Sequence, residues 1–160
     1  MADPIAVQRL NHAVLFVRDV ERSVRFYRDV FGFEEIVREA GGRAAFLRAR
    51  GSQNHHDLGL FEVGSNAPDP PRGTVGLYHL AWEVPTIEDL AAAREVLVEA
   101  GAYSGESDHG ATKSLYGHDP DGNEFEIMWM LPRDRWGEHE RRAIIAPLDL
   151  AAEVAEHGSD

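Results

Sequence analysis

Apolar and polar residues follow two spacings along this chain, which predict strands and helices. Residues 10–17 read Leu-Asn-His-Ala-Val-Leu-Phe-Val, a largely apolar run that is typical of a buried strand. The apolar positions of residues 20–31 then recur at the i, i+4 and i+7 spacing of one helix face. Asp19 is a suitable N-cap for this helix, and Gly32 is a suitable terminator. The chain therefore begins with a predicted strand followed by a predicted helix.

Three more strands are expected after this helix. Residues 33–39 and 43–48 alternate in polarity on either side of a Gly-Gly pair, which predicts a hairpin. Residues 56–63 then form a third strand-like run, and a stretch rich in Pro, Asn and Gly follows it. These elements together make one β-α-β-β-β unit.

The same order of elements restarts in the second half of the chain. Residues 77–84 read Leu-Tyr-His-Leu-Ala-Trp-Glu-Val, so His79 takes the third position of its run, as His12 does in the first. A second helix is predicted over residues 87–100, after an N-capping Thr86. Three strands are expected to follow, over residues 102–108, 113–118 and 123–130. We interpret the chain as an α+β protein that uses one βαβββ unit twice.

This repeat predicts a division of the chain into five segments. They are an N-terminal arm (1–9), a first βαβββ module (10–66), a linker (67–76), a second βαβββ module (77–131) and a C-terminal tail (132–160). The first part of the tail is charged and is expected to be irregular, and its last part is expected to form a short helix.

Composition and charge exclude several classes of function. The 160 residues are 43% hydrophobic and 28% charged, as in ordinary globular proteins. A formal net charge of −12 argues against a nucleic-acid partner, because phosphate groups require a basic patch. The absence of cysteine excludes disulfides and thiolate sites, so a metal site must use His, Asp or Glu. No run resembles a signal peptide or a membrane span, which predicts a cytoplasmic protein without a membrane partner.

A carboxylate near the end of the second repeat suggests metal chemistry. Residues 119–123, Asp-Pro-Asp-Gly-Asn, predict a tight turn before the last strand, in which Glu126 falls among apolar residues. Together with His12 and His79, Glu126 makes the set of two histidines and one carboxylate that is typical of non-haem Fe(II) sites. A lone histidine in an apolar strand is more often a hydrogen-bonded core residue. Two histidines at equivalent positions of a repeat favour metal ligands instead.

Three segments together resemble one family. Asn-His-Ala-Val-Leu-Phe-Val, Tyr-His-Leu-Ala-Trp-Glu-Val and Asp-Pro-Asp-Gly-Asn-Glu-Phe-Glu are similar to motifs of the vicinal oxygen chelate superfamily, which includes glyoxalases, bleomycin-resistance proteins and extradiol dioxygenases. The resemblance covers residues 10–130. It implies two βαβββ modules that form a cupped mixed sheet around a divalent metal. It also implies His12, His79 and Glu126 as metal ligands, and a homodimer or higher homo-oligomer.

Three further places resemble the extradiol dioxygenases among these proteins. The segment His-His-Asp-Leu that contains His56 resembles a dioxygenase segment in which this histidine is the acid–base catalyst beside O₂. His109, in Asp-His-Gly, matches a histidine that assists the bound catecholate. Tyr116 lies ten residues before Glu126, the spacing of a tyrosine that hydrogen-bonds the substrate. Each of the three, taken alone, is also compatible with a structural role.

The resemblance implies an Fe(II)-dependent extradiol dioxygenase that acts on a catechol-type aromatic diol with O₂. The same ligands also accept Mn²⁺, Zn²⁺, Ni²⁺ or Co²⁺. Two alternatives stay open: a metal-dependent glyoxalase, isomerase or epimerase, and a non-enzymatic protein that binds an aromatic drug. His118 is an alternative to His109 as the second active-site histidine. The candidate pocket-lining residues are His118, Phe61, Trp82 and Trp129.

Overall fold

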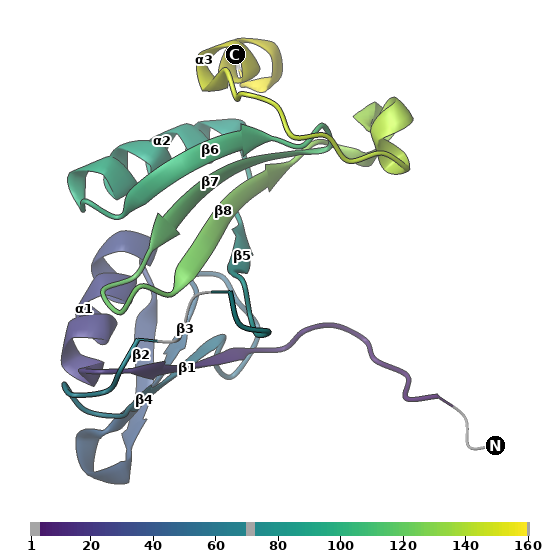
Figure 1. Cartoon of the computed structure of the whole chain (residues 1–160). Coiled ribbons are helices and arrows are strands. Elements are labelled where there is room, and N and C mark those ends of the chain that lie inside the picture. Colours follow the sequence, from purple (N-terminus) through teal and green to yellow (C-terminus); the bar gives the residue numbers. More distant parts are fainter. Residues whose placement is uncertain (1–3, 70–72, 160) are drawn as a thin grey trace. The chain divides into compact units, whose positions relative to one another are not determined.

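The computed structural model of the chain describes residues 4–69 and 73–159, and it divides into two compact units, Met1–Asp69 and Pro70–Asp160. Each unit contains one four-stranded mixed sheet and a helix that packs on it (Figure 1). The predicted α+β class and the repeated βαβββ order are confirmed.

The first unit has the strand order β1-β4-β3-β2, in which β1 runs parallel to β4 and the other pairs are antiparallel. Its elements are β1 (Ala13–Val17), α1 (Val20–Phe31), β2 (Glu34–Glu39), the short 3₁₀ helix η1 (Ala40–Gly42), β3 (Ala44–Arg48) and β4 (Leu58–Glu62).

Helix α1 has the bounds that the apolar spacing predicts. The Asp19 side chain accepts a hydrogen bond from the Arg22 amide, and Gly32 ends the helix at φ 68°, in the left-handed region where glycine is favoured. Val24 and Tyr27 are buried on the face that packs against the sheet.

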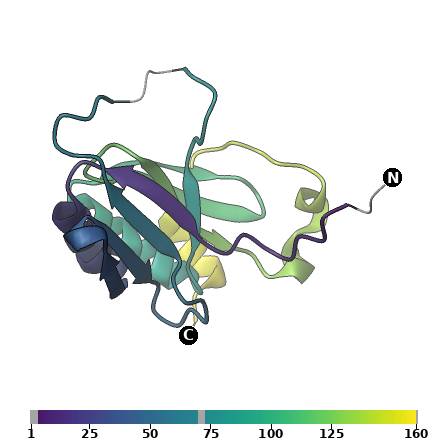
Figure 2. The same ribbon diagram turned by 90° about the horizontal axis from the view of Figure 1, so that it is seen from below.

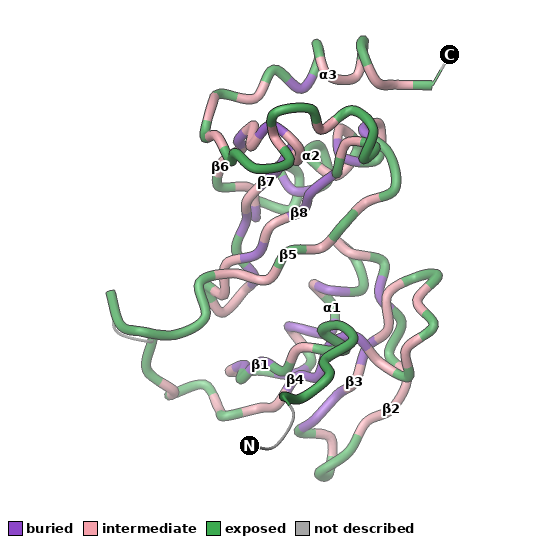
Figure 3. The backbone as a smooth tube through the Cα atoms, turned by 90° about the vertical axis from the view of Figure 1, so that its right-hand side faces the viewer, coloured by how far each residue is buried: buried purple, intermediate pink, exposed green. Residues whose placement is uncertain are grey.

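The second unit repeats this topology, with the strand order β5-β8-β7-β6 and with β5 parallel to β8. Its elements are β5 (Leu80–Glu83), α2 (Ile87–Glu99), β6 (Tyr103–Asp108), β7 (Thr112–His118) and β8 (Glu124–Met130). Most buried strand residues lie on the inner strands β3, β4, β7 and β8, whereas the edge strands β2 and β5 contain none (Figure 3).

The first strand of each unit is shorter than predicted. Strand β1 begins at Ala13 and β5 begins at Leu80, so His12 and His79 each lie one residue before their strand rather than inside it. The reason is the parallel partner: the first pair of the β1 ladder joins Ala13 to Leu58, where β4 itself begins. Both histidines therefore occupy equivalent places at the start of an edge strand.

The turn between β7 and β8 is built around Asp119, which is 5% exposed. Its carboxylate accepts hydrogen bonds of 2.9 Å from the amides of Asp121 and Asn123, and a third of 2.9 Å from the Asn123 side chain. Gly122 takes φ 83°, which a residue with a side chain rarely adopts. This turn sets the register that places Tyr116 opposite Glu126.

The C-terminal tail is more regular than predicted. The stretch expected to be irregular forms two 3₁₀ helices, η2 (Arg133–Arg135) and η3 (Gly137–Glu140), and α3 (Leu150–His157) then follows. Helix α3 lies beside α2 (Figures 1 and 2). It is also tied to the sheet by Lys113 of β7, which is buried and contacts Asp108 at 2.7 Å and Glu153 at 3.0 Å.

Within the parts of the chain that the structure describes, none of the helices has the length and apolar character needed to cross a membrane.

We expect Lys113→Met to lower the free energy of unfolding by about 3 kcal/mol. The substitution leaves the carboxylates of Asp108 and Glu153 close together and without their shared cation. Urea denaturation followed by circular dichroism measures the change. The control is Arg142→Met, which removes an exposed ion pair with Glu138 and should cost less than about 0.5 kcal/mol. Equal losses in the two variants would contradict this account.

Candidate metal centre and the adjoining cavity

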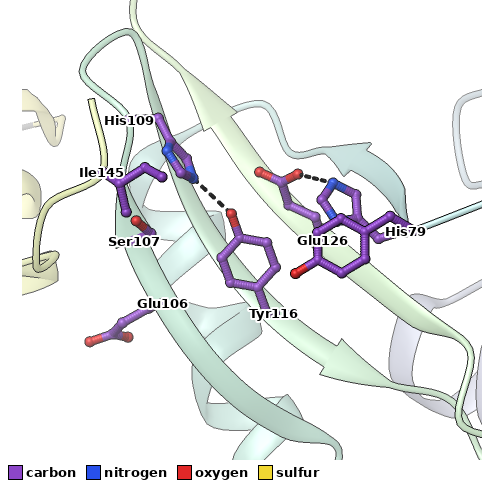
Figure 4. A pocket seen from close by; sticks show the side chains of 8 residues that line it. His79, Glu106, Ser107, His109, Tyr116, Glu126 and Ile145 are labelled. Atoms are coloured by element: carbon purple, nitrogen blue, oxygen red, sulfur yellow. Dashed lines mark hydrogen bonds and ion pairs between the residues drawn. The ribbon is translucent and has the colours of Figure 1, made fainter. Parts of the chain in front are cut away.

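Two of the predicted metal ligands meet in the second unit. His79 precedes β5 and Glu126 lies on β8, and their Nε2 and Oε2 atoms are 3.0 Å apart (Figure 4). The parallel register pairs Ala81 with Glu126, which brings the beginning of β5 beside this carboxylate. Glu126 retains only 12% of its side-chain exposure, so the pair is largely shielded from water.

The geometry of this pair fits a divalent metal. Imidazole nitrogen and carboxylate oxygen bind such ions at about 2.1 Å, so two neighbouring ligands of one ion lie about 3 Å apart. The other ring nitrogen of His79, Nδ1, is buried and has no hydrogen-bond partner among the residues that the structure describes. Oε1 of Glu124 lies 3.5 Å from this nitrogen. A carboxylate in this place is the usual companion of a metal-binding histidine.

The third predicted ligand, His12, belongs to the first unit. Its ring centroid lies 4.6 Å from that of His56, and its Nδ1 is 2.9 Å from Oδ1 of Asn11. No group of three or more His, Asp or Glu residues that could hold a metal is found among the described residues. The structure thus joins two of the three predicted ligands, and His12 as the third stays a prediction.

A serine that the sequence analysis missed supports Glu126. Ser114 of β7 is fully buried, and its hydroxyl donates a hydrogen bond to Oε1 of Glu126. Ser114 and Tyr116 are two residues apart on one strand, so both face the side of the sheet that carries Glu126. The alternation of β7 was the signal from which this residue could have been found.

A cavity of about 540 Å³ adjoins the pair in the second unit (Figure 4). Its lining residues are Tyr78, His79, Glu106, Ser107, His109, Tyr116, Glu126 and Ile145. Glu106 points away from the other side chains, toward Arg94 of α2 at 2.8 Å. Glu126 is therefore the carboxylate in this lining that faces the imidazole of His79.

His109 and Tyr116 form a hydrogen-bonded pair on the wall of the cavity. Nε2 of His109 lies 2.7 Å from the hydroxyl oxygen of Tyr116 (Figure 4). Burial raises the pKa of Tyr116 above its ordinary value, and the negative charge of Glu126 adds to the effect. The hydroxyl of Tyr116 therefore keeps its proton at neutral pH and can take part in hydrogen bonding.

The structure separates His118 from this pair. His118 ends β7, keeps 47% of its side-chain exposure and lies 3.7 Å from Glu124. It is not among the residues that line the cavity, whereas His109 is. The geometry favours His109 over His118 as the partner of Tyr116.

His56 lies in the first unit, in the loop before β4. Its ring contacts those of His12 and Phe46, at centroid distances of 4.6 and 5.0 Å. Burial lowers the pKa of His56, and the neighbouring His12 and His55 lower it further. Phe61 also lies in this unit, where it packs edge-on against Phe46.

The two tryptophans expected to line a pocket face the helices instead. Trp129 is 7% exposed and packs against His157 of α3. Trp82 pairs in the ladder with Ile127, which lies on the same side of the sheet as Trp129. Because side chains alternate along a strand, Ile127 and Trp129 lie on the face of β8 opposite to Glu126, and Trp82 shares their face. This corrects the expectation for Trp82 and Trp129.

Comparisons with known proteins agree on one family. Residues 9–127 match the model of the Glyoxalase/Bleomycin resistance protein/Dioxygenase superfamily. The chain is 38% identical to the catechol-2,3-dioxygenase of Bacillus subtilis over 127 residues, which are 79% of this chain and 43% of that protein. It is 34% identical to biphenyl-2,3-diol 1,2-dioxygenase 3 of Rhodococcus globerulus over 122 residues, 75% of this chain and 62% of that protein. The chain thus spans about half the length of these curated relatives.

Solved structures share the fold. A glyoxalase/dioxygenase from Nostoc punctiforme has a TM-score of 0.66 at 22% identity, over 82% of this chain and 97% of that one. The fosfomycin resistance protein FosX from Listeria monocytogenes has a TM-score of 0.60 at 21% identity, over 81% of this chain and 98% of that one. At these identities the likeness establishes the fold and not the reaction.

We expect Ser114→Ala to weaken the binding of Mn²⁺ by at least about 10-fold, because the hydrogen bond that orients the Glu126 carboxylate is lost. Isothermal titration calorimetry measures the affinity. Ser107→Ala is the matched control, since the Ser107 hydroxyl bonds to the carbonyl of Ala146 rather than to Glu126. Unchanged affinity in Ser114→Ala would show that this serine does not support the metal site.

Proposed function

Because the chain belongs to the glyoxalase/bleomycin resistance protein/dioxygenase superfamily, we propose that it is an extradiol dioxygenase, which opens the ring of a catechol-type aromatic diol with O₂ and Fe(II). The observation that carries this proposal is the hydrogen-bonded pair of His109 and Tyr116, beside the His79–Glu126 pair in one cavity. A diol held at the metal would have its oxygens within reach of this polar wall. The names of the relatives, a catechol-2,3-dioxygenase and a biphenyl-2,3-diol dioxygenase, support the same reaction.

In the proposed site His12, His79 and Glu126 hold the metal. When bound, a divalent metal of this kind lowers the pKa of coordinated hydroxyls and supplies the redox chemistry that O₂ requires. Fe(II) is the metal proposed. Relatives named as iron-dependent and as manganese-dependent dioxygenases are consistent with either of these two ions.

The protein's own residues have two tasks in this proposal. Tyr116 binds and orients the diol through a hydrogen bond on one wall of the cavity, and His109 assists through its own hydrogen bond to Tyr116. His56 gives and takes a proton, a role that suits an imidazole whose pKa burial lowers from its ordinary value of about 6.5. Its ring packs edge-on against that of Phe46.

The glyoxalase-type alternative is less well supported. It would take a fourth ligand, a Glu or Gln, from the last strand of the first module. The first three residues of β4 are Leu58, Gly59 and Leu60, and the two leucines are fully buried. Glu62 is engaged elsewhere, since its Oε2 accepts the amide hydrogen of Val20 at the start of α1 at 3.2 Å. The described part of β4 therefore offers no acidic residue free for this role.

The remaining features of the proposal follow from family membership and composition. We propose a small aromatic diol and O₂ as substrates, a homodimer or higher homo-oligomer as the assembly, and the cytoplasm as the location.

Ring cleavage is tested directly with protein loaded anaerobically with Fe(II). On mixing with catechol or biphenyl-2,3-diol in air-saturated buffer, we expect a yellow ring-opened product and uptake of one O₂ for each diol consumed. Absorbance and an oxygen electrode measure the two quantities. Glu126→Gln should lose at least about 100-fold in rate, because a metal ligand is weakened. No turnover of any diol at full iron occupancy would overturn the proposal.

His56→Ala should lower kcat for ring cleavage by about 100-fold or more while the bound iron is unchanged, because a proton-transfer group is removed and no ligand is lost. Stopped-flow kinetics and metal analysis measure the two effects. The matched control is His118→Ala, which alters an exposed histidine and should leave kcat within about two-fold. A His56→Ala variant with wild-type kcat would remove His56 from the mechanism.

A further inference from the structure

We propose that the C-terminal tail is a positioning element of this cavity: the main-chain carbonyl of Ile144 fixes the tautomer of His109, and this orients the hydroxyl of Tyr116. The observation is a chain of two hydrogen bonds through one imidazole ring. Nδ1 of His109 lies 2.9 Å from the Ile144 oxygen, and its Nε2 lies 2.7 Å from the Tyr116 oxygen.

The direction of both bonds follows from the chemistry of the groups. A carbonyl oxygen only accepts, so Nδ1 of His109 must carry the proton in the bond to Ile144. In a neutral imidazole the other nitrogen is then unprotonated and accepts. The O–H of Tyr116 therefore points at Nε2 of His109, and its oxygen can accept a hydrogen bond from a ligand in the cavity. Tyr116 thus accepts a hydrogen bond from a ligand hydroxyl.

The tail is fixed in the place that this role requires. Two residues after Ile144, the main chain of Ala146 pairs with Asp108, with an N–H donated in each direction at 2.9 and 3.0 Å. The hydroxyl of Ser107 also donates to the Ala146 carbonyl, at 3.3 Å. The tail is therefore bonded to the end of β6 directly before His109, so the carbonyl and the imidazole cannot move independently.

The turn that carries His109 is also packed from the tail side. Gly110 takes φ 82°, and a Cβ atom at this position would lie 2.3 Å from Nδ1 of His139. The ring of His139, in η3, thus rests on the main chain of the residue that follows His109. Figure 4 shows the side chain of Ile145 beside His109, on the same wall of the cavity.

The tautomer is measured by ¹⁵N NMR of histidine-labelled protein, with the His109 signals identified by their loss in His109→Gln. The spectrum is recorded near pH 8.5, about two units above the ordinary histidine pKa. We expect a protonated Nδ1 and an unprotonated Nε2. A protonated Nε2, alone or together with Nδ1, would overturn the proposal. This measurement needs neither metal nor turnover, so it stands apart from the test of ring cleavage.

The part played by the tail is tested with Ala146→Pro, which removes the N–H that bonds to the Asp108 carbonyl while leaving Lys113 and Glu153 to hold α3. We expect the Nδ1–H signal of His109 to give way to a mixture of tautomers. Ile145→Ala is the control, because it shortens a cavity side chain and keeps every main-chain group. A pure Nδ1–H tautomer in folded Ala146→Pro would show that the tail does not set it.

Two substitutions of His109 separate the positioning role from simple anchoring of the tail. Asn can replace Nδ1 as the donor to Ile144, whereas Gln can replace Nε2 as the acceptor for Tyr116. We expect His109→Asn to keep the thermal stability and lose at least about 10-fold in kcat/KM for the diol, and His109→Gln to retain more of the activity. An Asn variant as active as the unmodified protein would show that His109 only holds the tail and does not orient Tyr116.

Discussion

The register between β7 and β8 is the constraint on which the candidate site depends. It places Ser114, Tyr116 and Glu126 on one face of the second sheet, while Leu115 and Ile127 fill the core on the other. A slip of one residue would bury the Glu126 carboxylate among apolar side chains and turn the aliphatic residues outward. The buried Asp119 fixes the turn that joins the two strands, because its carboxylate accepts three hydrogen bonds from the turn itself.

The candidate site residues differ between the two units, although the units share one topology. In the first unit the ring of His56 contacts the rings of His12 and Phe46. In the second unit His79 meets Glu126 on the cavity wall. The duplicated fold therefore supplies equivalent positions, and each copy fills them with different groups. Because the order of elements repeats, it can be predicted from the sequence more readily than the site, whose residues differ between the two copies.

Elements with local signals could be predicted from the sequence. Helix α1 is specified by its cap, its apolar spacing and a terminating glycine, so both of its ends were predicted correctly. The starts of β1 and β5 depend on where their parallel partners begin, which is not a local property, so both strands were predicted too long. The roles of Ser114 and the two tryptophans depend on which face of their strand packs against the helices, and the alternation of a strand does not by itself reveal this. The bond from His109 to a main-chain oxygen of Ile144 has no side-chain signature, so no sequence pattern could have revealed it.

The buried ion pair that holds α3 involves the only lysine of the chain, Lys113, whose side chain is 7% exposed. Every other cationic side chain that carries a fixed charge is an arginine. Reagents that acylate amines therefore find one side-chain target, and it is covered as long as α3 stays docked. The rate at which that single amine reacts reports how often the C-terminal helix leaves the sheet, without any engineered label.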